Sequence, residues 1–295
     1  MKTVVFPLPG NEGLACSLAD RIGAELGALQ MRRFPDGESY VRYETVVEGR
    51  PTILVCTLDR PDEKFLPLVF AAAAARDLGA TEVGLVAPYL AYMRQDRRFQ
   101  PGEAITSTYF AQTLDRWIDW LVTVDPHLHR RHSLSEIYSI PAFAVHAAPA
   151  ISAWIRKAIK SAVLIGPDSE SAQWVGAVAN EAGAPFVVLE KTRRGDRDVE
   201  VSVPHIDRWR ARKPVLVDDI ISTAKTMIET VGHLKAAAMV PPVCVGVHAV
   251  FANKAYEELQ EVGAGQIVTC NTIPHLSNVI DLTKLLADGV QSLSA

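Results

Sequence analysis

Short apolar runs alternate with longer helical patterns along most of this chain, and that alternation limits the folds available to it. The apolar runs predict strands at residues 3–6, 52–57, 83–87, 121–124, 163–165, 186–189, 215–217 and 243–250. The segments between them predict helices at residues 12–26, 65–78, 106–117, 150–159, 171–182, 226–238 and 254–261. Apolar strands that alternate with helices favour mainly parallel sheets flanked by helices, so we expect an α/β fold.

The length of 295 residues fits one large domain or two of ordinary size. The segment 140–150, IPAFAVHAAPA, is rich in Pro and Ala and is the expected crossover between two halves. We therefore place one domain at residues 1–147 and a second at residues 148–295. No strict sequence repeat relates the halves, so a duplication is a hypothesis from their parallel layout alone.

Charge and composition exclude several classes of partner. The chain has 30 Lys and Arg against 34 Asp and Glu, so the net charge of −4 argues against a nucleic-acid coat but allows a local anion site. Its four cysteines form no CxxC pair, and we expect buried free thiols in a reducing compartment. We see no signal core, and the uncharged stretch 236–253 contains Pro241 and Pro242. We expect a cytoplasmic protein with no membrane partner.

The segment VLVDDIISTAKT, residues 215–226, carries the strongest chemical signal. An apolar strand ends in Asp218 and Asp219, and a hydroxyl-rich turn then leads into a helix. Backbone N–H groups of such a strand–turn–helix connection can hold a phosphate, and the paired acids can accept hydrogen bonds from a sugar diol. The segment suits a phosphorylated pentose. The simpler alternative is an acidic strand end followed by an N-capped helix.

This segment resembles the phosphoribosyl-diphosphate binding motif of type I phosphoribosyltransferases and ribose-phosphate pyrophosphokinases. FPDGE at 34–38, YMRQDRRF at 92–99, DPHLHR at 125–130, GPD at 166–168 and EKTRRG at 190–195 follow the order found in the pyrophosphokinases. A simple phosphoribosyltransferase would be about half as long and would lack the first three motifs. The chain thus resembles the ribose-phosphate pyrophosphokinase family over nearly its whole length. The resemblance implies two phosphoribosyltransferase-like α/β domains, with ATP-site elements in the first and the ribose 5-phosphate site in the second.

For the adenine of ATP, the resemblance implies a pocket made by the FPDGE turn. Phe34 would stack on the base, and Asp36 and Glu38 would accept its hydrogen bonds. Taken alone, this segment is an ordinary turn signal. The family places the turn in a neighbouring subunit's site, which implies a homo-oligomer of at least two copies.

For the phosphates and the metal, the resemblance implies that Arg94 and Gln95 contact ATP and that His127 lies beside the phosphates and Mg²⁺. Guanidinium groups suit polyphosphate because they bind oxygen pairs and stay charged. Asp168 matches an acidic residue that faces metal and ribose. The HxH pair His127 and His129 is also compatible with zinc, although no further ligand stands at a convincing spacing.

For catalysis, the resemblance implies that the basic stretch at 190–195 is a mobile loop whose key cations are Lys191 and Arg193. A loop of this kind can close over substrates and neutralise charge in the transition state. As an isolated run it would be an ordinary solvated loop. The acids Asp218 and Asp219 would fix the ribose. The residues that would hold its 5-phosphate are Ser222, Thr223, Ala224, Lys225 and Thr226.

Two departures from the family pattern bear on this assignment. Ser169, Glu170 and Ser171 stand where small residues are usual, and Lys225 stands where Gly commonly precedes the final Thr of the phosphate loop. A positive φ at Lys225 would cost about 1–2 kcal/mol, which its ammonium could offset by pairing with the 5-phosphate.

The sequence therefore predicts a ribose-phosphate diphosphokinase that uses ATP, ribose 5-phosphate and Mg²⁺. The departures also motivate a different hypothesis, a catalytically silent regulatory homologue that binds nucleotide or a partner synthetase. Against that alternative stand the retained residues Lys191, Arg193 and His127 and the pair Asp218 and Asp219. A phosphoribosyltransferase acting on a base is a third possibility.

Overall fold

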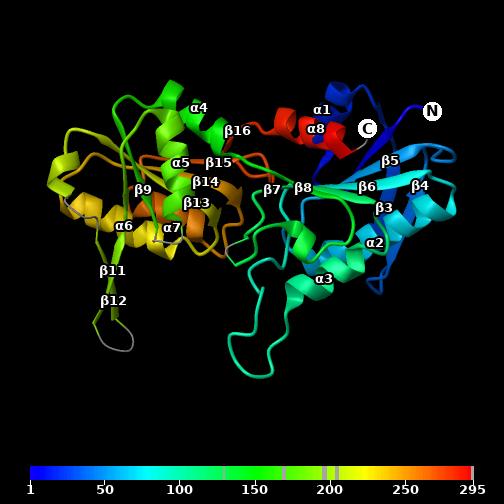
Figure 1. Cartoon of the computed structure of the whole chain (residues 1–295), viewed down its shortest axis with the longest axis horizontal. Helices are drawn as coiled ribbons and strands as arrows, with labels where there is room; N and C mark the ends of the chain where they lie inside the picture. Colours follow the sequence, from blue (N-terminus) through cyan, green and yellow to red (C-terminus); the bar gives the residue numbers. More distant parts are fainter. Residues whose placement is uncertain (129, 168–170, 195–197, 203–205, 294–295) are drawn as a thin grey trace. The chain divides into compact units, whose positions relative to one another are not determined.

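The computed structural model describes residues 1–128, 130–167, 171–194, 198–202 and 206–293, without the side chains of residues 190–207 (Figure 1). The chain divides into two compact units. The first contains Met1–His146, Thr272–Pro274 and Leu282–Ala295, and the second contains Ala147–Asn271 and His275–Asp281. These units differ from the expected domains 1–147 and 148–295 mainly at the C-terminal end of the chain. There, Thr272–Pro274 and the last segment belong to the first unit.

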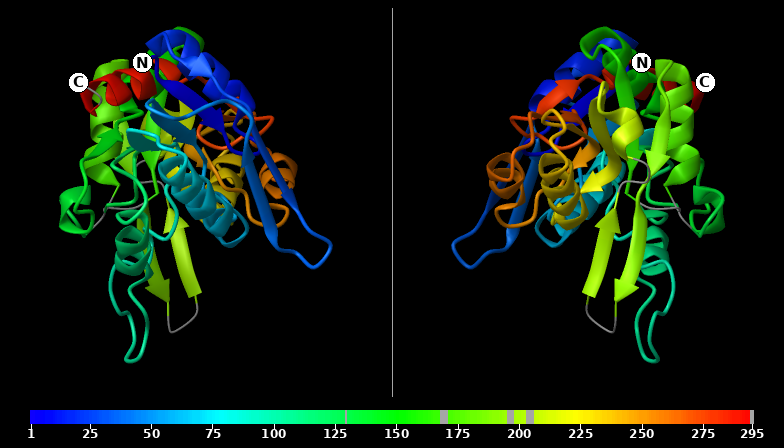
Figure 2. Two further views of the ribbon diagram at one scale, coloured as in Figure 1. Left: turned by 90° about the vertical axis from the view of Figure 1, so that its right-hand side faces the viewer. Right: turned by 90° about the vertical axis from the view of Figure 1, so that its left-hand side faces the viewer.

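The first unit is built on a six-stranded parallel sheet with the order β2-β1-β5-β6-β7-β8. Its strands are β1 (Val4–Pro7), β2 (Glu25–Leu26), β5 (Pro51–Val55), β6 (Glu82–Ala87), β7 (Trp120–Val124) and β8 (Ala142–Val145). Its helices are α1 (Glu12–Ile22), α2 (Pro61–Asp77), α3 (Thr106–Leu114) and α8 (Thr283–Leu293), with a 3-10 turn at Leu134–Glu136. The hairpin of β3 (Leu29–Arg33) and β4 (Ser39–Tyr43) extends from this unit (blue, Figure 2).

The second unit contains a second six-stranded parallel sheet with the order β10-β9-β13-β14-β15-β16. Its strands are β9 (Ala162–Gly166), β10 (Phe186–Val188), β13 (Lys213–Ile221), β14 (Val243–Ala249), β15 (Gln266–Cys270) and β16 (Asn278–Ile280). Its helices are α4 (Ala148–Ala158), α5 (Ala172–Ala182), α6 (Lys225–Ala236) and α7 (Ala255–Glu261), with a 3-10 turn at Ile206–Trp209. A hairpin joins β11 (Glu190–Arg194) to β12 (Asp198–Ser202).

The two sheets have the same topology. Each begins with a strand, a helix and an edge strand, inserts an antiparallel hairpin, and then continues with strands and helices toward the opposite edge. The parallel α/β architecture predicted from the alternation is confirmed. The common order of the two sheets also supports the hypothesis of duplication, which the residues themselves do not display.

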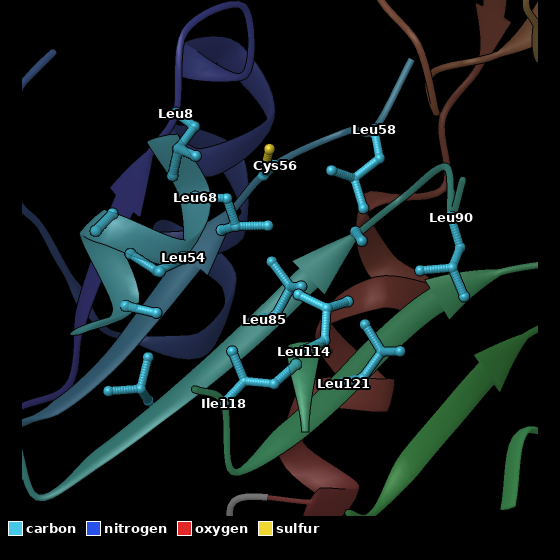
Figure 3. Packing of buried hydrophobic residues seen from close by; sticks show 14 of the residues in the cluster. Leu8, Leu54, Cys56, Leu58, Leu68, Leu85, Leu90, Leu114, Ile118 and Leu121 are labelled. Carbon is cyan, nitrogen blue, oxygen red and sulfur yellow. The ribbon is translucent and has the colours of Figure 1, made fainter. Parts of the chain in front are cut away.

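The core of the first unit forms where apolar residues of the sheet meet α2 and α3. Leu54 on β5, Leu85 on β6 and Leu121 on β7 pack with Leu68 of α2 and Leu114 of α3, and all five are buried (Figure 3). Strands that are covered by helices bury nearly every residue, which explains why these strands are continuous apolar runs in the sequence.

Two predicted boundaries are wrong for identifiable reasons. The helix expected over residues 12–26 ends at Ile22, because Gly23 takes a left-handed conformation with φ 66° and caps it. The chain then pairs Glu25 with Val4 as the edge strand β2. The strand expected over residues 215–217 extends to Ile221, so Asp218 and Asp219 lie within β13 and not after it.

The cysteines largely match the expectation of buried free thiols. All four cysteines are free, and three are buried, whereas Cys16 is exposed. Burial raises the pKa of the Cys56 and Cys244 thiols to about 12. Within the described ranges, we find no helix long and apolar enough to cross a membrane.

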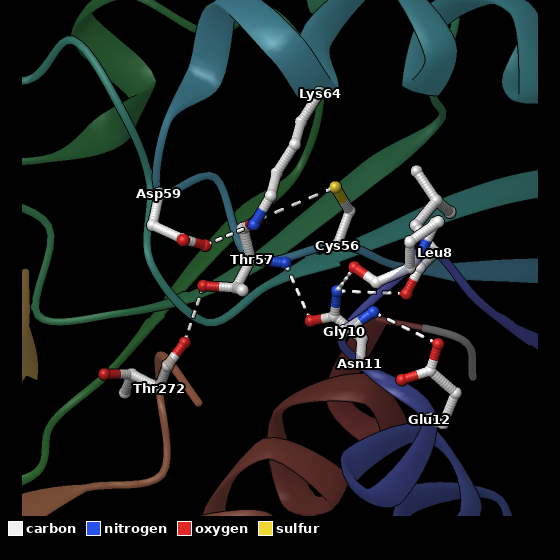
Figure 4. A network of polar contacts seen from close by, with 10 residues as sticks. Leu8, Gly10, Asn11, Glu12, Cys56, Thr57, Asp59, Lys64 and Thr272 are labelled. Atoms are coloured by element: carbon white, nitrogen blue, oxygen red, sulfur yellow. Dashed lines mark hydrogen bonds and ion pairs between the residues drawn. The ribbon is translucent and has the colours of Figure 1, made fainter. Parts of the chain in front are cut away.

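A buried polar network ties the carboxyl ends of β1 and β5 together (Figure 4). The Asn11 side chain accepts a hydrogen bond from the Thr57 N–H at 2.9 Å and donates to the Leu8 carbonyl at 3.2 Å. The Thr57 hydroxyl donates to the Thr272 carbonyl at 2.6 Å, which anchors the segment that returns from the C-terminal end of the chain. Thr57 and Thr272 are both 1% exposed, so neither group could turn to water if the other were lost.

Replacing the Thr57 hydroxyl is predicted to destabilise the protein. In Thr57→Val the buried Thr272 carbonyl loses the hydrogen bond from the Thr57 hydroxyl, and the free energy of unfolding should fall by about 1–3 kcal/mol. Thr52→Val is the matched control, because the Thr52 hydroxyl is also buried but has no hydrogen-bond partner among the described residues. Urea unfolding of both variants should show a loss only for Thr57→Val, and equal losses would contradict this role of the hydroxyl.

Candidate active site

The connection from β13 to α6 brings the predicted acids and the predicted phosphate loop together. Asp218 and Asp219 are half-buried at the carboxyl end of β13. Each carboxylate accepts a bond from the next N–H, Asp219 to Asp218 at 3.0 Å and Ile220 to Asp219 at 2.8 Å. Three residues further on, the turn over residues 222–224 leads into α6. Paired acids and a helix start therefore stand within one short connection.

The loop that follows β14 forms two backbone hydrogen bonds to this turn. The Phe251 N–H donates to the Ile221 carbonyl at 2.8 Å, and the Ala252 N–H donates to the Ser222 carbonyl at 3.0 Å. These bonds fix the carbonyl side of the turn. The first N–H groups of an α-helix have no partner inside the helix, so the start of α6 offers donors to an anion.

A left-handed residue makes this turn possible, and it is Ala224. Its φ is 53° and its ψ is 11°, and it is the N-cap of α6, without a side-chain capping bond. Lys225 is the exposed first residue of the helix and is not among the positive-φ residues. The strain considered for Lys225 thus falls on its neighbour, where a left-handed conformation costs about 1–2 kcal/mol.

The predicted adenine residues occupy the turn of the β3–β4 hairpin. The Phe34 N–H donates to the Glu38 carbonyl at 2.8 Å, and Gly37 supplies the positive φ of 95° that the turn requires. The Asp36 carboxylate accepts the Glu38 N–H at 3.2 Å. Phe34 is 40% exposed, which leaves ring surface available to a ligand.

Sequence reasoning missed the residue that orients Phe34. The guanidinium carbon of Arg32 lies 4.5 Å from the centre of the Phe34 ring and 4.2 Å from that of Tyr40. Such cation–π contacts hold an exposed ring in place. The alternation of Arg32, Phe34 and Tyr40 around the turn is the signal that could have indicated it.

The predicted phosphate residues Arg94 and Gln95 follow β6 in the first unit. Arg94 is exposed, whereas the Gln95 side chain accepts a hydrogen bond from the Thr106 hydroxyl at the start of α3, at 3.0 Å. The neighbouring Asp96 pairs with Arg130 at 3.2 Å. The partner of Asp96 therefore comes from the loop after β7.

His127 is half-buried in the loop that follows β7. Two residues earlier, Asp125 takes a positive φ of 31° and its carboxylate lies 3.1 Å from His146 Nδ1. The hydrogen bond to Asp125 raises the pKa of His146 above its usual value. This pair beside His127 was not anticipated from the sequence.

The remaining predicted residues are not tested by side-chain geometry. Asp168, Ser169 and Glu170 lie outside the described residues, and so does His129. The backbone of Lys191 and of Arg193 belongs to β11, opposite Val201 and Val199, but their side chains are not described. In the described part of the chain, no group of three His, Cys, Asp or Glu is placed to hold a metal ion.

The doubled parallel sheet and the acid–turn–helix connection of β13 define the class: this is a phosphoribosyltransferase-like α/β protein. A family model of the N-terminal domain of ribose phosphate pyrophosphokinase matches residues 3–117, and one of the phosphoribosyl transferase domain matches residues 133–282.

Relatives of known family match nearly the whole chain. Ribose-phosphate pyrophosphokinases of Methanopyrus kandleri and Methanothermobacter thermautotrophicus are 32% and 33% identical, each over 97% of this chain and 99% of the relative. The chain therefore belongs to the ribose-phosphate pyrophosphokinase family. The fold agrees with the crystal structure of phosphoribosylpyrophosphate synthetase from Mycobacterium smegmatis, with a TM-score of 0.87 at 22% identity over 100% of this chain and 99% of that one.

Relieving the left-handed Ala224 is predicted to stabilise the protein. Ala224→Gly should raise the free energy of unfolding by up to about 1 kcal/mol, because Gly adopts positive φ without steric cost. The same change at Ala236, near the end of α6, should instead lower it by up to about 1 kcal/mol. Thermal or urea unfolding distinguishes the two signs. A loss of stability in Ala224→Gly would contradict the strain assigned to this turn.

The Asp125–His146 pair predicts a raised histidine pKa. NMR titration should place the pKa of His146 above 6.5, and Asp125→Asn should lower it. Because the folded value is the higher one, the pair stabilises the fold fully below about pH 6.5, and this contribution is lost as the pH rises through the folded pKa. His146 is largely exposed, so the effect on stability should be small. An unchanged pKa in Asp125→Asn would contradict the assignment.

Proposed function

We propose that this protein transfers the diphosphoryl group of ATP to the 1-hydroxyl of ribose 5-phosphate, giving phosphoribosyl diphosphate and AMP. The observation that carries the proposal is the β13–α6 connection, in which two carboxylates near the carboxyl end of β13 precede a turn with a left-handed residue and the start of a helix by a few residues. Membership of the ribose-phosphate pyrophosphokinase family supports the same reaction.

A site for ribose 5-phosphate must bind both the ribose hydroxyls and the 5-phosphate, and the β13–α6 connection offers groups for each. Asp218 and Asp219 accept hydrogen bonds from the vicinal ribose hydroxyls. The 5-phosphate is held by backbone donors and hydroxyls at the start of α6 and in the turn before it. The residues proposed for this part are Ser222, Thr223, Ala224, Lys225 and Thr226. The exposed Lys225 ammonium adds positive charge at the same place.

ATP is proposed to bind through residues of the first unit. Phe34 stacks on adenine while Asp36 and Glu38 accept hydrogen bonds from the base, and we propose that this hairpin serves a neighbouring subunit in a homo-oligomer. Arg94 and Gln95 contact the phosphates, where a guanidinium can bind two oxygens at once.

We propose that Mg²⁺ binds together with ATP, because Mg²⁺ commonly takes its oxygen ligands from substrate phosphates and only one or two protein groups. His127 and Asp168 are the residues that would hold it, and the ion would neutralise the phosphate oxygens. The ribose 1-hydroxyl attacks the β-phosphorus, the bond to AMP breaks, and the hydroxyl proton is released. Lys191 and Arg193 neutralise charge that develops on the transferred group. No residue is assigned as an obligatory general base.

We also propose a division of roles between the two domains and a cytoplasmic location. Residues 1–147 would supply the ATP elements and residues 148–295 the ribose 5-phosphate site, in a cytoplasmic enzyme of nucleotide biosynthesis. Nothing in the family or structural matches supports the silent regulatory alternative. A transferase acting on a base would not explain the match of the N-terminal family model.

An AMP-release assay with ATP, Mg²⁺ and ribose 5-phosphate tests the reaction. AMP and phosphoribosyl diphosphate should form in equal amounts, and Lys191→Ala should lower turnover by at least about a hundredfold while changing nucleotide affinity much less. Lys284→Ala is the control, because Lys284 is an exposed residue of α8 that pairs with Asp288. It should keep full turnover.

Two outcomes would contradict the proposal. The absence of AMP from folded protein, across several divalent metals, would favour the silent homologue. Full turnover in Lys191→Ala would remove Lys191 from the mechanism while leaving the reaction itself in place.

A further inference from the structure

The first unit contains a cavity that none of the proposed substrate residues lines. Its volume is about 300 Å³, within the range of sites for small ligands. Its lining includes apolar residues together with Cys56 and Tyr40, and also three cationic residues and one acidic residue. The charged members are Arg32, Arg33, Glu63 and Lys64, and Ser39 also lines the cavity.

The cavity lies at the topological switch point of the first sheet. Leu8 directly follows β1 and Cys56 directly follows β5, and these two strands are neighbours in the sheet. From β1 the chain continues to the edge strand β2, whereas from β5 it continues to β6 on the other side. Open α/β sheets bind ligands in the crevice where strand order reverses in this way. Leu8, Cys56 and Lys64 are seen together in Figure 4.

The second sheet reverses its order at the corresponding place, between β9 and β13. There the proposed ribose 5-phosphate loop connects β13 to α6. The two connections share an unusual detail: Arg60, the N-cap of α2, has a φ of 50°, and Ala224, the N-cap of α6, has a φ of 53°. The cavity of the first unit is thus the topological counterpart of the proposed sugar-phosphate site.

The chemistry of the two places differs. Where β13 carries Asp218 and Asp219 near its carboxyl end, the first unit has Cys56, the residue after β5, in the lining of the cavity. Because β5 carries no pair of acids like Asp218 and Asp219, the cavity lacks the carboxylates that would accept hydrogen bonds from a ribose diol. Glu63 is its one lining carboxylate, against Arg32, Arg33 and Lys64. The lining charge favours an anion, and the apolar wall favours a ligand with an apolar body.

The cations of the lining are positioned by other groups. Lys64 donates to the Thr57 carbonyl at 3.0 Å and pairs with Asp59, and Arg32 stacks on the aromatic rings of the hairpin. The Arg33 guanidinium donates to the Glu63 carbonyl at 3.1 Å. This bond uses one of the five N–H donors of Arg33 and orients its guanidinium, so Arg33 is the best candidate to pair with a bound anion.

We propose that this cavity is a second binding site, for a compact organic anion that joins one carboxylate to an aromatic or otherwise apolar body. The site belongs to the first unit alone. It does not rest on the proposed reaction, and it would stand if no AMP were formed.

Fluorine NMR with the full chain tests the site, with 4-fluorobenzoate as the anionic probe and 4-fluorobenzyl alcohol as its neutral counterpart. The carboxylate should bind saturably below about 10 mM. The alcohol should bind at least about tenfold more weakly, because charge-assisted hydrogen bonds are lost. Equal binding of the two probes, or no saturable binding, would overturn the proposal.

Two variants locate the binding. Arg33→Gln should weaken 4-fluorobenzoate by about tenfold, whereas Arg42→Gln on the same hairpin, which does not line the cavity, should have no effect. Ser39→Phe should block the cavity in a chain whose circular dichroism is unchanged. Binding that survives in folded Ser39→Phe would overturn the proposal. Displacement of the probe by ribose 5-phosphate or ATP would also do so, because it would place the probe in the proposed substrate sites.

Discussion

Parallel pairing of β13 with β9 on one side and β14 on the other is the constraint on which the candidate active site depends. Leu216 lies opposite both Ile165 and Cys244, so the carboxyl ends of three neighbouring strands meet at one edge of the sheet. The loop after β14 can then bond to the carbonyls of Ile221 and Ser222. The sheet thus fixes the positions of the acids of β13 and of the start of α6, and the turn between them offers the groups proposed to bind the phosphate.

The two units show how one topology can carry different chemistry. Both sheets insert a hairpin before the strand that leads to their central helix, and both begin that helix with a left-handed residue, Arg60 in one and Ala224 in the other. At the strand ends, however, one unit has Cys56 and Thr57 and the other has Asp218 and Asp219. The scaffold determines where a ligand can bind, and the side chains at the strand ends determine which ligand it is.

Much of the fold and part of the candidate site could be predicted from the sequence. Buried strands and covered helices leave periodic patterns, and the segment at 215–226 keeps its acids and its turn close in the chain. The sequence does not say whether Ala224 or Lys225 has the positive φ. The hydrogen bonds between this turn and the loop after β14, which fix the conformation of the turn, are not visible in the sequence. The contact of Asp125 with His146 joins two positions, 21 residues apart, that no local pattern relates.

The central claim is that the β13–α6 turn binds the phosphate of ribose 5-phosphate, and hydrogen–deuterium exchange tests it most directly. Backbone donors that bind a phosphate exchange more slowly, so ribose 5-phosphate should slow the amides of residues 222–226. The corresponding turn of the first unit, residues 57–60, should exchange at the same rate with and without the sugar phosphate. Unchanged exchange at residues 222–226 under saturating ribose 5-phosphate would contradict the account.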